Sequence, residues 1–301
     1  MAVTIPSWRI ARVSFTTAEP AACSTFFREA LGFEETGIEE RVDAAFGRLM
    51  GLPGARAQVR LLRLGSQEIE LVAFAEKGRP YPPGSTSSDP WFQHVAIVVS
   101  DMGAAYRRLM AWPGWTPIST SGPQSLPDSS GGVTAFKFRD PEGHPLELIE
   151  FPPARTPKIW QAPRGADPCL GLDHSAIVVS STAASVAFYQ RLGFINAGRS
   201  CNHGIEQARL DAIPGAKVEV TRLHTAAMDA PPQLELLCYR VSSARSPPTA
   251  DGRSNDIATT RDRASCAAWD YACAASCRPQ WSLDGRGYGC GQECLPNGPP
   301  A

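Results

Sequence analysis

Two distant segments of this sequence repeat each other. FFREALGFEE (26–35) recurs as FYQRLGFINA (188–197), and each copy predicts an amphipathic helix that ends in Leu-Gly-Phe. A later Pro-Gly-Ala motif is displaced by the same 161 residues, from Pro53 to Pro214, as the Leu-Gly-Phe motif, from Leu31 to Leu192. Because two independent landmarks share one offset, the chain is expected to contain a duplicated structural unit.

Each copy predicts the same order of elements. A β-branched strand comes first, a helix follows, and alternating strands then lead to an apolar strand with a central Glu, as in EIELVAF and QLELLCY. A shorter version lies between the copies, from WFQHVAIVVSD to HPLELIEF. The sequence therefore predicts an α+β fold of three β-α-β-β-β modules, at about 8–75, 91–151 and 171–240, whose strands pair into a curved mixed-sheet cup.

The spacing of the modules suggests a domain division. The 161-residue offset favours pairing of modules one and two within residues 1–152, with a Pro-rich linker at 153–170. The third module, 171–240, would then lack a partner, and its open edge would favour a homodimer. Residues 241–301 are expected to be a truncated or aberrant fourth module with an irregular tail.

The tail concentrates cysteine. Five of the nine cysteines lie between Cys266 and Cys294. The pairs at 273/277 and 290/294 could form a zinc site, but C-x3-C is not the usual spacing of such sites. Disorder, or an out-of-frame continuation of a lost module, is the favoured interpretation, since 25 Arg against 4 Lys indicates a GC-rich gene.

Bulk composition excludes several partners. The net charge of −1 and the pI of about 6.5 give no reason to expect nucleic acid or an anionic membrane. The N-terminus lacks the apolar core of a signal peptide, and no apolar run reaches transmembrane length. With few cysteines before residue 240, a cytoplasmic protein is expected.

Polar residues recur at matching places in the modules. His94 and His174 open the first strands of modules two and three, and Glu70, Glu147 and Glu235 stand in the middle of the three last strands. Period-two alternation places each of these side chains on the face opposite the helix, the concave face. If first and last strands are neighbours, His94 and Glu147 converge there. His144, after the turn DPEG, is expected to be exposed.

These modules resemble the vicinal oxygen chelate superfamily, which includes glyoxalases, extradiol dioxygenases and bleomycin resistance proteins. The resemblance rests on AFYQRLGF, FQHVAIVVSD and FKFRDPEGHPLELIEF and covers about residues 8–240. It implies two modules closing around one divalent metal (Fe, Mn, Zn, Co or Ni), with ligands from first and last strands. Carried over, the first pair offers Glu70, His94 and Glu147, while the fourth position is Arg12, which cannot ligate a metal.

Two alternatives remain open. Arg12 could pair with Glu70 and neutralise it, which would leave a cup that binds its ligand without metal. Modules two and three could instead pair, which would assemble His94, Glu147, His174 and Glu235 as an alternative site. This second arrangement ranks behind the pairing of modules one and two.

The resemblance also implies a chemistry. A metal that chelates two adjacent oxygens of a small oxygenated metabolite would support glyoxalase-like lyase or isomerase chemistry, with Glu147 or Glu70 as the catalytic carboxylate. Arg12 and His203 are candidates for substrate binding. Extradiol-type ring cleavage and metal-free binding of a small molecule are the competing functions.

Overall fold

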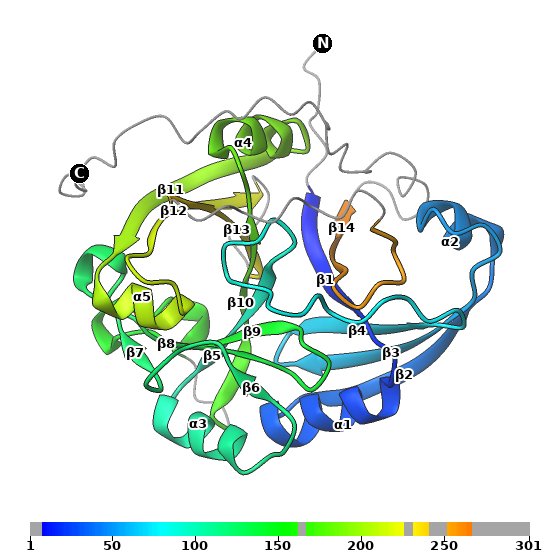
Figure 1. Cartoon of the computed structure of the whole chain (residues 1–301), viewed down its shortest axis with the longest axis horizontal. Coiled ribbons are helices and arrows are strands. Elements are labelled where there is room, and N and C mark those ends of the chain that lie inside the picture. The colour runs from blue at the N-terminus through cyan, green and yellow to red at the C-terminus, as the bar shows by residue number, and fades with distance from the viewer. Residues whose placement is uncertain (1–7, 162–166, 226–230, 241–251, 267–301) are drawn as a thin grey trace.

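The protein contains two mixed β-sheets flanked by helices (Figure 1). Its computed structural model describes residues 8–161, 167–225, 231–240 and 252–266. This is the expected α+β class with open mixed sheets. Within the described ranges, no helix has the length and apolar character needed to cross a membrane.

The first module supplies four of the five strands in the smaller sheet. Its first helix begins with a proline, whose fixed φ suits a helix start, and ends at Gly32 in the left-handed conformation (φ 78°). In chain order the elements are β1 (Trp8–Thr16), α1 (Pro20–Leu31), β2 (Glu34–Arg41), α2 (Ala44–Leu49), β3 (Ala57–Leu64) and β4 (Gln67–Phe74).

The second module begins the larger sheet. The carboxylate of Asp101 caps its helix by accepting a hydrogen bond from the backbone N–H of Ala104 at 2.8 Å. The elements are β5 (Gln93–Val99), α3 (Met102–Met110), β6 (Thr116–Pro117), β7 (Gln124–Ser125), η1 (Asp128–Ser130), β8 (Thr134–Arg139) and β9 (Pro145–Glu150), and the linker that follows contains η2 (Pro153–Arg155) and η3 (Lys158–Trp160).

The third module repeats the order of elements found in the first. Strand, helix, strand, helix and two further strands follow one another in both. The elements are β10 (Cys169–Val178), α4 (Thr182–Arg191), β11 (Phe194–His203), α5 (Ile205–Asp211), β12 (Lys217–Thr225) and β13 (Gln233–Tyr239), and β14 (Thr260–Cys266) ends the described chain.

In every module the first and last strands are parallel neighbours. The register opposes Ser14 to Glu70 in β1 and β4, Ala96 to Glu147 in β5 and β9, and Ala176 to Glu235 in β10 and β13. Each central Glu therefore lies beside the first strand of its own module, as the sequence predicted.

The sheets join the modules differently from the expected pairing of one with two. β5 pairs antiparallel with β10, so modules two and three form one nine-stranded sheet with the order β11-β12-β13-β10-β5-β9-β8-β6, and β7 pairs with β8. Module one instead pairs with β14, which gives the order β14-β1-β4-β3-β2. The third module is thus not unpaired, and the reason for expecting a homodimer is removed.

Part of the region expected to be aberrant is an ordered strand. β14 runs antiparallel to β1, with Thr260 opposite Phe15 and Arg263 opposite Arg12. Its sequence, TRDRASC, lacks the apolar alternation that marks the other strands, which is why the sequence did not predict it. The rest of the expected tail, 241–251 and 267–301, and with it the zinc hypothesis, lies outside the described residues.

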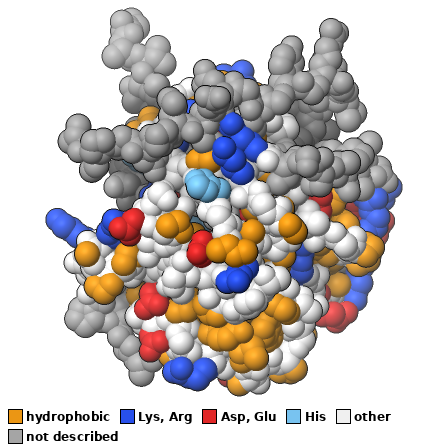
Figure 2. All heavy atoms as spheres, turned by 60° about the vertical axis from the view of Figure 1, so that its left-hand side comes forward, with side chains coloured by type: hydrophobic (Ala, Val, Ile, Leu, Met, Phe, Trp, Pro, Cys, Tyr) orange, Lys and Arg blue, Asp and Glu red, His pale blue; other side chains and the backbone are white. Residues whose placement is uncertain are grey.

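One core packs the helix side of both sheets. Val95, Ile97 and Leu148 of the larger sheet belong to the same buried cluster as Phe15 and Phe27 of the first module. α1 and α3 lie side by side against it (Figure 1). On the outside, charged side chains of both signs are interspersed with hydrophobic ones over the face seen in Figure 2.

His144 is fully buried, contrary to the expectation that it would be exposed. Its Nδ1 lies 2.7 Å from Oδ2 of Asp140, and its Nε2 lies 2.9 Å from the backbone oxygen of Thr16, so it ties module two to module one. Both partners only accept hydrogen bonds, so both ring nitrogens must donate. Although burial opposes it, the carboxylate of Asp140 raises the pKa of His144.

We expect a His144→Gln variant to lose about 2–3 kcal/mol of unfolding free energy near pH 6, because it cannot satisfy both acceptors. Since the pKa of His144 is raised on folding, its contribution is fully present below pH 6.5 and is lost as the pH rises through the folded pKa. Urea unfolding of both proteins between pH 6 and 9 measures this difference. A gap that stays constant or widens with pH would contradict it, and His203→Gln, at an exposed position, is the control.

Candidate metal centre

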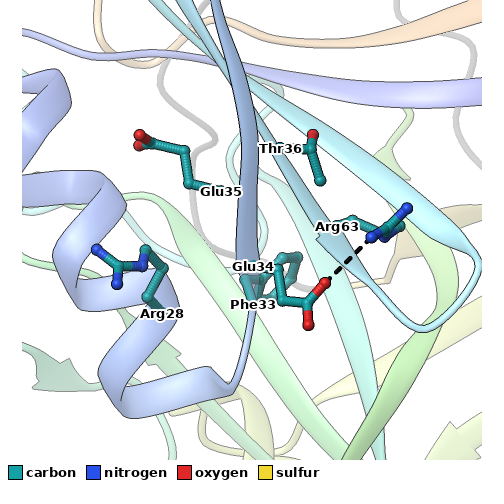
Figure 3. Close-up of a pocket in the computed structure, with 6 residues that line it drawn as sticks. All are labelled: Arg28, Phe33, Glu34, Glu35, Thr36 and Arg63. Carbon is teal, nitrogen blue, oxygen red and sulfur yellow. Dashed lines mark hydrogen bonds and ion pairs between the residues drawn. The ribbon is translucent and has the colours of Figure 1, made fainter.

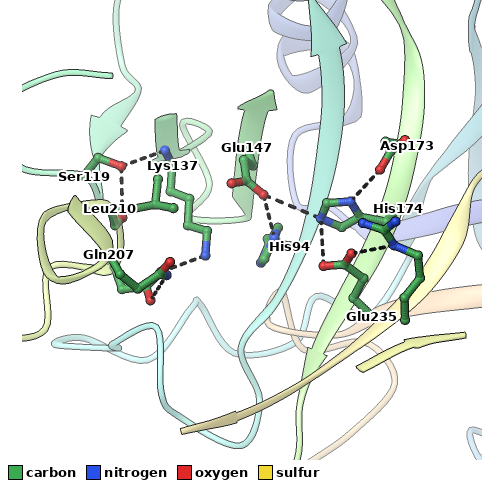
Figure 4. A network of polar contacts seen from close by, with 11 residues as sticks. His94, Ser119, Lys137, Glu147, Asp173, His174, Gln207, Leu210 and Glu235 are labelled. Atoms are coloured by element: carbon green, nitrogen blue, oxygen red, sulfur yellow. Dashed lines mark hydrogen bonds and ion pairs between the residues drawn. The ribbon is translucent and has the colours of Figure 1, made fainter. Parts of the chain in front are cut away.

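Pairing of modules two and three brings two histidines and two glutamates together on the concave face. Nε2 of His94 lies 3.0 Å from Oε2 of Glu147, and Nε2 of His174 lies 3.6 Å from both Oε2 of Glu147 and Oε2 of Glu235 (Figure 4). All four side chains are buried. This is the set that the sequence analysis ranked second.

The separations suit a shared cation. Ligand atoms about 2.1 Å from a metal lie about 3.0 Å apart at right angles and about 3.4 Å apart at tetrahedral angles. One ligand atom from each of His94, Glu147 and His174 lies within 4.8 Å of the others. Imidazole and carboxylate ligands together suit Zn, Fe, Mn, Co or Ni.

A carboxylate outside the cluster orients His174. Oδ2 of Asp173 lies 2.9 Å from its Nδ1, so its Nε2 faces the glutamates. Such a carboxylate–histidine contact is typical of metal sites, where it fixes the ring that holds the metal. Burial alone would lower the pKa of His174, but Glu235, Asp173 and Glu147 raise it to about 10.

His94 has a different environment from His174. Its Nε2 contacts Glu147, while its Nδ1 is buried and has no hydrogen-bond partner among the described residues. Burial lowers the pKa of His94, and the nearby ammonium of Lys137 lowers it further. His94 is therefore favoured as a neutral imidazole, which is the form that binds a metal.

Lys137 is the main charged neighbour that the sequence analysis overlooked. It stands directly opposite Glu147 in the β8–β9 ladder, and its Nζ forms a buried ion pair with Oδ1 of Asp211 at 2.7 Å. Despite burial, Asp211 and Glu147 raise the pKa of Lys137. Alternation in VTAFKF already placed Lys137 on the face of Glu147, and this was the available signal.

Helix α5 covers this part of the concave face. Asp211, at its end, accepts from Lys137 and from Nε2 of Gln207. Ser119 Oγ donates to the backbone oxygen of Leu210 at 2.9 Å, which ties the loop after β6 to the same helix (Figure 4). The cover keeps bulk water away from the cluster.

Among the described residues, the charges around the cluster do not cancel without a further cation. Four carboxylates stand against two side chains that remain cationic, so two negative charges are left over. The carboxylates belong to Glu147, Asp173, Asp211 and Glu235, and the cations are Lys137 and Arg222, whose Nε lies 3.3 Å from Glu235. The proton on His174 supplies one of the missing positive charges. A divalent cation bound to His174 in place of that proton would supply both.

Glu70 and Arg12, which were expected at the metal and the substrate, lie in the other sheet. Oε1 of Glu70 is 3.1 Å from Arg12 and 3.3 Å from Arg41, and it also contacts Arg263. Ser14 Oγ donates to its second oxygen at 2.8 Å. Arginine side chains thus neutralise Glu70, and its pairing with Arg12 is the one that the first alternative supposed. Glu70 is not part of the cluster that contains His94.

His203 lies away from the cluster. It is exposed at the end of β11, opposite Lys217, whereas Arg222, the partner of Glu235, stands opposite Gly198. The five-residue difference along β11 corresponds to about 16 Å. A contact between His203 and a ligand of the cluster is therefore not supported by this geometry.

Two hollows on the protein differ in their relation to the cluster. One, of about 400 Å³, is lined by Asp173 and Arg222, which contact cluster residues directly. The other, of about 810 Å³, lies between α1 and β2 (Figure 3), where Arg63 already pairs with Glu34 at 3.1 Å. Of these two, the smaller hollow is lined by residues that contact the candidate metal ligands, whereas the four ligand candidates do not themselves line it.

The sequence and the fold both match known proteins. Residues 9–148, just under half of the chain, match the model of the Glyoxalase/Bleomycin resistance protein/Dioxygenase superfamily. No functionally curated protein matches significantly.

Solved structures of maize glyoxalase I share the fold. Glyoxalase I from Zea mays is 18% identical, with a TM-score of 0.50 over 77% of this chain and 67% of that one. A mutant of the same maize enzyme is 18% identical, with a TM-score of 0.51 over 78% of this chain and 68% of that one. At this identity the likeness establishes the architecture and not the reaction.

We expect Lys137→Met to cost about 3–5 kcal/mol of unfolding free energy, because it leaves Asp211 buried without its cationic partner. Adding Asp211→Leu should restore most of the loss, and urea unfolding of the single and double variants measures both steps. The control is Lys77→Met, which removes an exposed ion pair with Glu19 and should cost less than about 1 kcal/mol. A double variant no more stable than the single would contradict the assignment.

Proposed function

We propose that the protein is a metal-dependent enzyme that performs lyase or isomerase chemistry on a small molecule with two adjacent oxygens. His94, Glu147 and His174 would hold one divalent cation, with Glu235 beside it. The observation that carries this proposal is the convergence of the ligand atoms of His94, Glu147 and His174, all within 4.8 Å of one another, inside a region short of positive charge.

The bound cation would act as a Lewis acid on the two substrate oxygens. Glu235 is suited to take a proton from the carbon beside the carbonyl, because it lies at the edge of the cluster next to Arg222 and the smaller hollow. Glu147 is less suited because, although burial opposes it, Lys137, His174 and His94 hold its pKa well below the ordinary value. Lys137 would favour negative charge developing on substrate oxygen, and α5 would exclude water.

The metal assignment predicts a clear pattern of metal content. Purified protein should carry about one divalent ion per chain, and His174→Ala should weaken its binding at least about tenfold. Glu70→Gln is the matched control, because Glu70 is also a buried strand Glu but belongs to the arginine cluster of the other sheet. Elemental analysis after dialysis measures both. Equal metal retention in the two variants would remove His174 from the site, and no metal in the parent protein would support metal-free binding instead.

The base assignment is tested with hydroxyacetone, which has adjacent hydroxyl and carbonyl oxygens. We expect the protein to exchange its carbon-bound protons in D₂O, followed by NMR, and Glu235→Gln to slow this exchange about 10²–10⁴-fold. Gln keeps a neutral oxygen at the same place, so the variant should fold and bind metal as the parent protein does. Folding and metal content measured on the same samples serve as controls. If Glu235→Gln exchanged these protons as fast as the parent protein, Glu235 would not be the base.

A second function is favoured by one observation. Among the described residues, the three side chains close enough to share an ion are His94, Glu147 and His174. Two histidines and one carboxylate are the ligand set of non-haem Fe(II) oxygenases. Consumption of O₂ with a catechol, dependent on Fe(II) and unaffected by Glu235→Gln, would favour the extradiol-type reaction over the lyase or isomerase reaction.

A further inference from the structure

The hollow of about 400 Å³ near the cluster is lined by both polar and apolar side chains. Its size falls in the range of small-molecule pockets, roughly 300–1,000 Å³. The larger sheet contributes the polar side chains of Asp173, Arg222, His224 and Gln233. The linker between modules two and three contributes the apolar side chains of Ile159 and Trp160.

The linker is fixed to the sheet at this point. Trp160 is only 4% exposed, and its ring lies against Gly171 of β10, where an added Cβ would approach the ring to 2.7 Å. Only glycine leaves room for this contact. The apolar wall of the hollow is therefore held in place by packing.

One carboxylate connects this wall to the candidate metal ligands. Trp160 Nε1 donates to Oδ1 of Asp173 at 3.3 Å, and Oδ2 of Asp173 contacts Nδ1 of His174 at 2.9 Å. On the same side, Arg222 contacts Glu235 and has a half-exposed side chain. A molecule in the hollow would thus lie next to the side chains that orient His174 and Glu235.

We propose that this hollow selects substrates that carry a ring-sized apolar group next to their chelating oxygens. The oxygens would face the sheet and the cluster, and the apolar group would lie against Ile159 and Trp160 of the linker. Ile159 is 37% exposed, so covering it with an apolar group would remove further apolar surface from water. This inference rests on the proposed function, because the cluster supplies the anchor for the oxygens.

Two α-hydroxy acids serve as probes, because mandelate and lactate share the chelating oxygens and differ in a phenyl ring against a methyl group. Calorimetric titration should show mandelate binding at least about tenfold more tightly than lactate. Ile159→Trp fills the hollow and should abolish this preference without weakening lactate. Ile38→Trp, at an exposed isoleucine of β2 in the other sheet, should leave the preference intact.

Metal content measured on the same samples separates this inference from the proposed function. A mandelate preference that depends on residue 159 in protein without metal would support the hollow and contradict the metal-dependent function. Equal affinities for the two acids, no binding of either, or a preference that survives Ile159→Trp would overturn the inference, whatever the metal content.

Discussion

The antiparallel pairing of β5 with β10 is the interaction on which the candidate site depends. It sets His94 opposite Ala176 and His174 opposite Ala96, so the two histidines, on different modules, face the same concave surface. Parallel pairing within each module then adds Glu147 and Glu235 beside them. Without the β5–β10 ladder, each module would present one His and one Glu, too few to enclose an ion.

The smaller sheet uses the same frame for different chemistry. β1 and β14 pair antiparallel as β5 and β10 do, but the opposed residues include Arg12 and Arg263. Two like charges opposite each other would be destabilising, and the buried Glu70 between them compensates. Guanidinium groups thus balance the central carboxylate in the smaller sheet, whereas the larger sheet leaves carboxylates in excess among the described residues.

Local patterns in the sequence predicted the modules, and long-range pairing decided the site. Alternation correctly put Val95 and Ile97 toward the core and His94 on the other face. Equivalence of modules one and three, however, does not specify which first strands meet, so Glu70 was expected beside His94. His144 looked like an exposed turn residue because Asp140 is a local partner in the same turn, while its second acceptor, the Thr16 carbonyl, is brought to it only by folding.

Anomalous scattering from crystals grown with Mn²⁺ or Zn²⁺ tests the central claim most directly. The account predicts one strong peak in the larger sheet, about 2.0–2.2 Å from ligand atoms of His94, Glu147 and His174. Glu235 should lie beside the ion, next to His174. A peak beside Glu70, or no peak between the two histidines at saturating metal, would contradict it.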